Sequence, residues 1–328
     1  MQPSYLLAGS YAYDTVLQHP QAFSKRILPE AIDRLNVSFN VESVIDEFGG
    51  CAGNIAYNAA LLGDKPMLCG NLGHDGERYL HRIDGWGLGT STLGFVQDQP
   101  TAHGWMLTDA AGNQIISFHG GAMAAAVKLP QVAPALWHIA PEDPVNMVKL
   151  AVAARARGAE YFFDPGQALP ALLEGVAEHI APLDEVLTEA TGIFVNDYEA
   201  RLLHRRFAPR ELLRDGQFIV RTRGADSVAL VSCAGRSLMQ MSIPTIAAQQ
   251  VVDPTGCGDA FRAGFLHAYT RGKRLAICVV LGSLMASVVV ASKGGQAHTV
   301  GRARILEQWA AEVRERFGVD IRQPELVR

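Results

Sequence analysis

The sequence predicts an α/β fold, a three-layer sandwich with a mainly parallel central sheet and a small β-sheet lid. From residue 135 onward, apolar runs typical of buried strands alternate with helix-like segments. Strands and helices that alternate in this way form a parallel sheet covered by helices on both faces. Two segments, 14–48 and 101–119, have strand-like patterns that do not fit the alternation. The 328 residues, with 48% hydrophobic content, are also enough for one large core.

The N-terminal part of the sandwich begins with an apolar strand at residues 5–12. A helix is expected at 52–62, because Gly63 follows it and glycine commonly ends helices. A strand at 67–73 and a helix at 76–84 come next.

Residues 101–119 are interpreted as a hairpin, because two strand-like runs flank the turn signal Ala111-Gly112-Asn113. We expect this hairpin to pair with the irregular segment 14–48 and to form a lid that stands off the sandwich. The chain then divides into a core of residues 1–13, 49–100 and 122–328 and a lid of residues 14–48 and 101–121.

The C-terminal part supplies most of the parallel sheet. A helix is expected at 144–157, with Pro144 near its start and Gly158 after its end. The apolar run 277–291 is about 15 residues long, which is short for a membrane span and suits a buried helix. Strands are expected at 135–140, 160–164, 192–196 and 218–222.

Charge and cysteine content exclude several classes of protein. The net charge is −4 and no long basic block occurs, which argues against nucleic acid and anionic membranes as partners. The first residues lack the basic region and the long apolar run of a signal peptide. The five cysteines are scattered without a CxxC pair, so reduced thiols in the cytoplasm are the simplest explanation.

The common nucleotide-binding motifs are absent from the sequence. It has no GxxxxGK[ST] P-loop, and the first strand leads to GSYAYD rather than to the GxGxxG of a dinucleotide-binding fold. A nucleotide enzyme with this sequence must therefore hold phosphate in another way.

The stretch DPTGCGDAFRAGF at 253–265 places two glycines directly before a helix-like segment. Glycines suit a turn that opens a helix, and such a turn leaves backbone N–H groups without partners. Together with the positive end of the helix dipole, these groups form a site for an anion. Asp259 lies at that place, and it is either an N-cap residue or a catalytic base beside an anion hole that receives phosphate.

Two places in the N-terminal part suit the hydroxyl groups of a substrate. Asp14 follows the first strand, where a carboxylate can accept hydrogen bonds from a vicinal diol or can simply form a turn. In FGGCAGNIAYN, Gly49 and Gly50 let a ligand approach the backbone, and Asn54 can both donate and accept. The alternative for this second motif is an ordinary capped turn.

Two places in the C-terminal part suit phosphate. In FVNDYEA, Asn196 ends a strand and Glu199 follows three residues later, a spacing that suits a phosphate–Mg²⁺ assembly but is also common in simple helix caps. Thr222 and Gly224 end another strand, where a hydroxyl and bare backbone can meet phosphate. All these places fall at the carboxyl ends of predicted strands, which is where open parallel sheets bind ligands.

The sequence resembles the ribokinase-like (PfkB) kinases. DPTGCGDAFRAGF is similar to the C-terminal signature of that family, and FGGCAGNIAYNAALLG is similar to its N-terminal glycine motif. GSYAYD, GNLGHDG, VNDYEA and SKGGQAH also fall in the family's order, so the resemblance runs from about residue 5 to 300. It implies an α/β sandwich with a β lid and phosphoryl transfer from ATP to a hydroxyl group.

The resemblance also implies a role for each site residue. Asp259 is the general base, and Gly256, Cys257 and Gly258 supply the amides of the anion hole. Many members carry Ala where this sequence has Cys257. The resemblance implies substrate binding by Asp14, Gly49, Gly50 and Asn54. It implies ATP binding by Asn196, Thr222 and Gly224, and organisation of Mg²⁺ by Glu199. Some members also bind a monovalent cation such as K⁺ at the positions of Asp253 and Thr255.

Within the family, GGCAGNIAYN, DPGQALP and GCGDAFRAG are most similar to prokaryotic nucleoside and adenosine kinases. This predicts ATP-dependent phosphorylation of the 5′-hydroxyl of a purine ribonucleoside of the adenosine, inosine or guanosine type. The alternatives are a sugar kinase acting on ribose, fructose or a related carbohydrate, and a nucleotide-binding regulator without turnover. Open lid edges allow a homodimer. The candidates to cover the base are Phe39, Val41, Trp105, Met106 and Met123.

Overall fold

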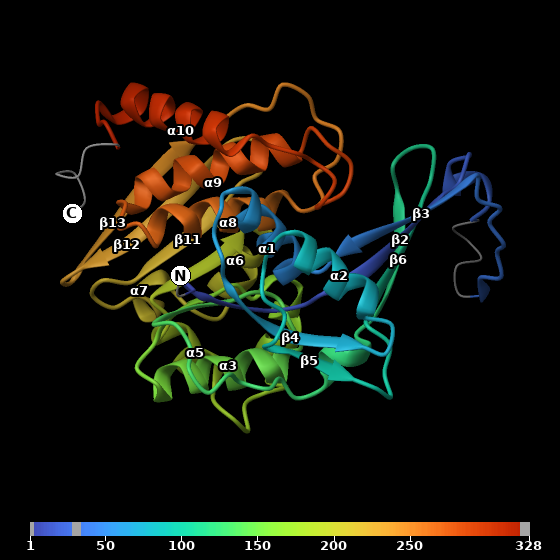
Figure 1. The fold of residues 1–328 in the computed structure, drawn as a ribbon, viewed down its shortest axis with the longest axis horizontal. Coiled ribbons are helices and arrows are strands. Elements are labelled where there is room, and N and C mark those ends of the chain that lie inside the picture. Colours follow the sequence, from blue (N-terminus) through green and yellow to red (C-terminus); the bar gives the residue numbers. More distant parts are fainter. Residues whose placement is uncertain (1–2, 28–33, 322–328) are drawn as a thin grey trace.

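The computed structural model describes residues 3–27 and 34–321. It confirms the predicted α/β sandwich with one large and one small sheet (Figure 1). The large sheet has nine strands. Their order across the sheet is β13 (Ser237–Pro244), β12 (Ser227–Ala234), β11 (Phe218–Thr222), β10 (Gly192–Asn196), β9 (Glu160–Phe163), β8 (Leu136–Ile139), β1 (Leu6–Ala8), β4 (Met67–Gly73) and β5 (Leu93–Val96).

The large sheet is parallel from β11 to β5, as the alternation of strands and helices predicts. Strands β12 and β13 extend it as an antiparallel ribbon. This ribbon is absent from the predicted elements, although Gly235 stands first in its two-residue connection, a position that glycine takes in type II′ hairpin turns.

Helices cover both faces of the large sheet and separate two apolar cores (Figure 1). Alternation along β1 shows the division, because Leu7 faces one core while Leu6 and Ala8 face the other. The first core contains side chains of α1 (Cys51–Leu61), α2 (Glu77–Gly85), α8 (Cys257–Tyr269), α9 (Leu275–Val289) and α10 (Arg302–Phe317), and the second those of α3 (Pro144–Ala156), α4 (Leu169–Leu173), α5 (Leu183–Thr188), α6 (Asp197–His204) and α7 (Pro209–Leu212).

The apolar run near the C-terminus forms α9, and most of its side chains are buried in the first core. The prediction of a buried helix there is confirmed. Across residues 3–27 and 34–321, no helix has the length and apolar character needed to span a membrane.

The small sheet projects from one end of the sandwich (Figure 1). The predicted hairpin is present, and the Asp109 carboxylate closes its turn by accepting the N–H groups of Ala111 and Asn113 at 2.8 Å each. The other predicted segment, 14–48, contributes two strands, although residues 28–33 lie outside the described part. The strand order is β3 (Ser43–Gly49), β2 (Ala12–Gln18), β6 (Ala102–Thr108) and β7 (Gln114–His119), with β2 and β6 parallel and the outer pairs antiparallel.

Helices α8 and α9 approach each other so closely that both need glycine at the contact. A Cβ atom added at Gly264 would lie 2.7 Å from the carbonyl oxygen of Leu281. One added at Gly282 would lie 2.8 Å from the carbonyl oxygen of Phe261. This contact fixes α8, whose first turn contains Asp259.

We expect Gly282→Ala to lower the free energy of unfolding by about 1–3 kcal/mol, because the added methyl group overpacks the contact between α8 and α9. Urea denaturation measures this change. Gly85→Ala is the matched control, since a Cβ atom there meets no heavy atom within 4 Å. Equal stability of the two variants would show that the close contact is not needed.

Candidate active site

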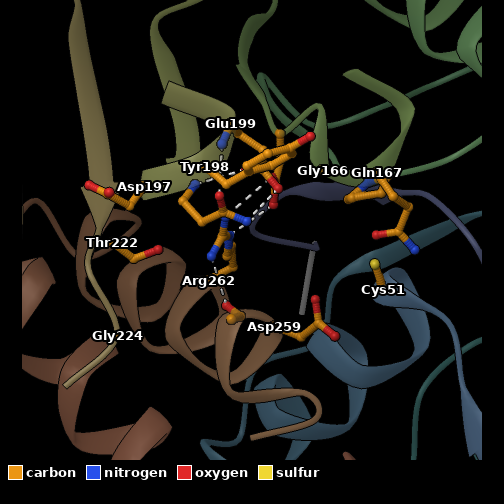
Figure 2. Close-up of a pocket in the computed structure, with 14 residues that line it drawn as sticks. Cys51, Gly166, Gln167, Asp197, Tyr198, Glu199, Thr222, Gly224, Asp259 and Arg262 are labelled. Carbon is orange, nitrogen blue, oxygen red and sulfur yellow. Dashed lines mark hydrogen bonds and ion pairs between the residues drawn. The ribbon is translucent and has the colours of Figure 1, made fainter. Parts of the chain in front are cut away.

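A cleft of about 500 Å³ opens at the carboxyl ends of β9, β10 and β11 (Figure 2). The first turns of α1, α6 and α8 also reach it, so helix N-termini from three separate parts of the chain converge there. This is the edge at which the parallel sheet was expected to bind a ligand. The cleft brings together six of the predicted site residues: Asn196, Glu199, Thr222, Gly224, Gly258 and Asp259.

The turn before α8 depends on the first glycine of its motif. Gly256 is the N-cap and has a φ of 77°, a left-handed conformation that glycine adopts without strain. A Cβ atom at Gly256 would also lie 2.7 Å from Cα of Gly295. This loop directs the start of α8, which includes Gly258 and Asp259, toward the cleft. Cys257 is half-buried beside it, and burial raises the pKa of its thiol to about 11.

Asp259 lines the cleft and accepts a hydrogen bond of 2.8 Å from Nδ2 of Asn54. Burial is the largest influence on this carboxyl group and raises its pKa to about 7. The hydrogen bond from Asn54 and the charge of Arg262 oppose this rise, while Asp164 adds to it. A carboxylate with a pKa near neutrality is well matched to accept a proton from a hydroxyl group.

A buried ion pair holds the first turn of α8 against the sheet. Arg262 donates to both carboxylate oxygens of Asp164, from Nε at 2.8 Å and from Nη2 at 3.2 Å. It also donates to the carbonyl oxygen of Gly258 at 3.3 Å. Asp164 is not among the predicted site residues. Its signal is a carboxylate directly after β9, at the same sheet edge as the other site residues.

Asn196 and Glu199 form a capping box at the start of α6. The Asn196 side chain accepts the N–H of Glu199 at 2.9 Å, and the Glu199 carboxylate accepts the backbone N–H of Asn196 at 2.8 Å and its Nδ2 at 2.7 Å. Burial, followed by the charge of Asp164, raises the pKa of Glu199. The helix-cap alternative is therefore present, and both capping residues also line the cleft.

Asp14 lies on β2 of the small sheet, where two glycines make room for its carboxylate. A Cβ atom at Gly49 would lie 2.0 Å from Oδ2 of Asp14, and one at Gly104 would lie 2.7 Å from Oδ1. Burial, with a contribution from Glu47, raises the pKa of Asp14 to about 6. Among the described residues the carboxylate has no hydrogen-bond donor, so it is available to a ligand.

The start of α1 connects Asp14 with Asp259. Gly50 is the N-cap of α1 with a φ of 83°, and Gly49 before it lies against Asp14. Asn54, in the first turns of the same helix, contacts Asp259. The glycine motif therefore links the two carboxylates that sequence analysis assigned to the substrate and to the base.

The possible cation residues lie beside a glycine loop that precedes α10. The Asp253 carboxylate accepts the N–H of Thr255 and the N–H of Gly294, both at 2.9 Å. Glu47 also approaches this loop, because a Cβ atom at Gly294 would lie 2.5 Å from its Oε2. Within the described chain, no group of three or more His, Cys, Asp or Glu side chains could hold a metal ion.

Comparison with known proteins identifies the family of this fold and cleft. Residues 11–300 match the pfkB family of carbohydrate kinases, and the chain belongs to that family. It is 31% identical to a nucleoside kinase of Methanocaldococcus jannaschii over 83% of this chain and 89% of that protein. It is 29% identical to a nucleoside kinase of Methanothermobacter thermautotrophicus over 94% of this chain and 97% of that protein.

A solved structure gives the same relationship. Burkholderia thailandensis nucleoside kinase in complex with inosine superposes with a TM-score of 0.78 at 34% sequence identity. The match covers 96% of this chain and 98% of that one. The sandwich and the small sheet are thus shared over the whole fold.

We expect Asp164→Ala to lower the free energy of unfolding by about 3–5 kcal/mol, because it leaves the Arg262 charge buried without a partner. Denaturant unfolding followed by circular dichroism measures the loss. Glu185→Ala is the control, since its pair with Arg155 is exposed and such pairs contribute about 0–1 kcal/mol. Similar losses in both variants would contradict a special role for the buried pair.

Proposed function

We propose that this protein transfers the γ-phosphoryl group of ATP to the 5′-hydroxyl of a purine ribonucleoside of the adenosine, inosine or guanosine type. The observation that carries the proposal is Asp259, a carboxylate with a pKa of about 7 that lines the cleft from the first turn of a helix. In this proposal the base lies beside amide groups that can receive phosphate. The nucleoside kinases among its relatives, one of them solved with inosine, favour this acceptor over a free sugar.

In this proposal ATP and the acceptor approach Asp259 from opposite sides. In the view of Figure 2, Thr222 and Gly224 lie on one side of Asp259, and Cys51 and Gln167 lie on the other. We assign the first side, with Asn196, to ATP, because a hydroxyl, a glycine and the start of α6 suit its phosphates. The second side, continuous with α1, is assigned to the nucleoside.

The chemistry requires one proton acceptor and several groups that stabilise negative charge. Asp259 takes the proton of the 5′-hydroxyl as the oxygen forms its bond to the γ-phosphorus, and ADP leaves with the electrons of the broken bond. The amides at Gly256, Cys257 and Gly258 stabilise the charge on the transferring group. Closure of the small sheet as a lid excludes water that would compete with the nucleoside.

Mg²⁺ is proposed to enter with ATP and to be organised by Glu199. Both Glu199 oxygens already accept hydrogen bonds from Asn196, so these residues fit contact through the waters of a hydrated ion rather than direct ligation. Mg²⁺ commonly keeps several waters and takes few protein ligands. The ion would neutralise phosphate charge during transfer.

A monovalent cation such as K⁺ is proposed beside Asp253 and Thr255. The carboxylates of Asp253 and Glu47 both approach Gly294, and the charge of Asp253 helps to raise the pKa of Glu47 after burial, the larger cause. A cation near these two carboxylates would relieve their repulsion.

The small sheet is proposed to hold the ribose and cover the base. Asp14 would bind the 2′ and 3′ hydroxyls, with Asn54 and the backbone of Gly49 and Gly50 beside them. Strand register places Gly104 opposite both Asp14 and Phe118, and a Cβ atom at Gly104 would lie 3.9 Å from the Phe118 ring.

The same register sorts the predicted base-covering residues. Met106 lies two residues from Gly104 and therefore on the face of Asp14. Trp105 is on the opposite face, where it stacks on His103 with ring centroids 4.3 Å apart. Phe39 packs against His19 and Phe23. We therefore favour Met106 and Phe118 for the base; Val41 and Met123 remain candidates without a contact that decides their role.

Two further properties belong to the proposal. Exposed apolar residues on edge strand β7, Ile115 and Ile116, favour a homodimer formed through the small sheet. The five cysteines are all free, which supports the cytoplasm as the compartment.

We expect Asp259→Asn to lower kcat by about 10²–10⁴-fold while leaving ATP binding nearly intact, because the shape of the side chain is kept and only the base is lost. Wild-type kcat/KM should fall as the pH drops below about 7, since a protonated Asp259 cannot accept the proton. Steady-state kinetics at several pH values measure both effects. Activity within threefold of wild type would leave Asp259 only as a helix-start residue.

We expect adenosine, inosine or guanosine to be phosphorylated with a higher kcat/KM than ribose or fructose, because burial of the base adds binding energy. A 2′-deoxynucleoside should be poorer, since it leaves a buried oxygen of Asp14 without a partner. Product mass after incubation with ATP identifies the acceptor. Faster turnover of a free sugar would favour a sugar kinase, and ATP binding without acceptor-dependent consumption would favour a regulator.

A further inference from the structure

A series of side-chain hydrogen bonds runs from α2 to the proposed base. Arg82 donates from Nε to Oε1 of Gln296 at 3.1 Å and from Nη2 to its backbone carbonyl at 2.8 Å. Gln296 donates from Nε2 to Oδ1 of Asn54 at 3.0 Å. Asn54 then donates to Asp259 at 2.8 Å. Both amide side chains are buried, with 4% of Gln296 and 6% of Asn54 exposed.

The two ends of this series allow only one orientation of the amides between them. A guanidinium group can only donate, so Gln296 must turn its oxygen toward Arg82 and its nitrogen toward Asn54. Asn54 must then present its oxygen to Gln296 and its nitrogen to Asp259. The ionised carboxylate of Asp259 can only accept, which agrees with that direction. The second hydrogen of Gln296 Nε2 goes to the hydroxyl of Tyr79 at 2.9 Å.

Local packing is adapted to this series. A Cβ atom at Gly53 would lie 1.9 Å from the Tyr79 hydroxyl, and one at Gly295 would lie 2.8 Å from Oδ1 of Asn54. The Tyr79 hydroxyl is fixed in turn, because it donates to the carbonyl oxygen of Gly49 at 2.6 Å. The glycines of two distant motifs therefore leave space for these bonds and for no other side chain.

We propose that Gln296 is a positioning residue that holds the Asn54 amide with its N–H toward Asp259 and so favours the ionised base. The inference rests on the proposed role of Asp259. Arg82 sets the donor-to-acceptor direction of these hydrogen bonds, since it fixes the orientation of the Gln296 amide. Neither residue needs to touch the substrate for this effect.

Other groups also influence the pKa of Asp259, and their effects must be distinguished from that of the hydrogen bonds through Gln296. Arg262 and Asp164 influence it as charges, and the thiol of Cys51 lies close enough to donate to it. Cys257 is a further titratable neighbour. None of these four forms a hydrogen bond to Gln296 or Arg82 in the described structure, so a change at Gln296 leaves them in place.

The test is the titration of the Asp259 carboxyl carbon by ¹³C NMR, assigned with Asp259→Asn. In Gln296→Met the Asn54 amide loses its partner and can rotate its oxygen toward Asp259. In Gln296→Glu an added acceptor attracts the Asn54 nitrogen away from Asp259. We expect the pKa of Asp259 to rise by about one unit in both variants, the amount that corresponds to the net value of one hydrogen bond.

The matched control is Gln167→Met, because Gln167 lines the same cleft but is exposed and has no bond to Asn54. It should leave the titration of Asp259 unchanged. A rise in Gln296→Glu alone would reflect only the added charge and would overturn the proposal. An unchanged titration in both Gln296 variants would also overturn it.

A second variant and a second measurement complete the test. If Gln296→Met does not fold, Arg82→Met gives the same information from a half-buried position on α2, and an unchanged titration there overturns the proposal. In active enzyme, the acid limb of kcat/KM should move upward with the NMR value. The NMR titration needs no turnover. A wild type that phosphorylates no nucleoside would therefore refute the proposed function, while the titration would still test the role of Gln296.

Discussion

The partial burial of one carboxylate that must still ionise is the constraint on which the rest of the site depends. A carboxyl group taken out of water favours its neutral form, and only neighbouring donors and positive charge can oppose that tendency. Asp259 has the donors of Asn54 and Cys51 and the positive charge of Arg262, and its pKa is about 7. Asn54 on α1 and Asp259 on α8 must therefore stay within hydrogen-bonding distance of each other.

The fold meets this constraint by fixing α8 on two sides. Arg262 ties the first turn of α8 to Asp164 at the sheet edge, and the glycine contact with α9 fixes the other side of α8. A buried ion pair is seldom a source of net stability, because desolvation offsets the attraction. The ion pair is better explained by its effect on Asp259. Arg262 keeps a positive charge beside that carboxylate and lowers its pKa, and the negative charge of Asp164 limits the decrease.

The sequence indicated the parts of this arrangement that depend on local pattern. The parallel sheet, the hairpin closed by Asp109 and the glycine turn before Asp259 follow from periodicity and turn residues. The connections between these parts were not predictable in the same way. Asp164 and Arg262 are 98 residues apart, Asn54 and Asp259 are 205 apart, and Asn54 and Gln296 are 242 apart. Such pairs form only when the topology brings strand ends and helix starts together, which a single sequence does not reveal.

The most direct test of Asp259 as the base is a crystal structure of the complex with a purine ribonucleoside and a non-hydrolysable ATP analogue. The proposed mechanism predicts a distance of about 2.6–3.2 Å between the 5′-oxygen and a carboxylate oxygen of Asp259, the reach of a general base. It also predicts that the 2′ and 3′ hydroxyls contact Asp14. A 5′-hydroxyl directed away from Asp259, with that carboxylate bonded only to Asn54, would exclude Asp259 as the base.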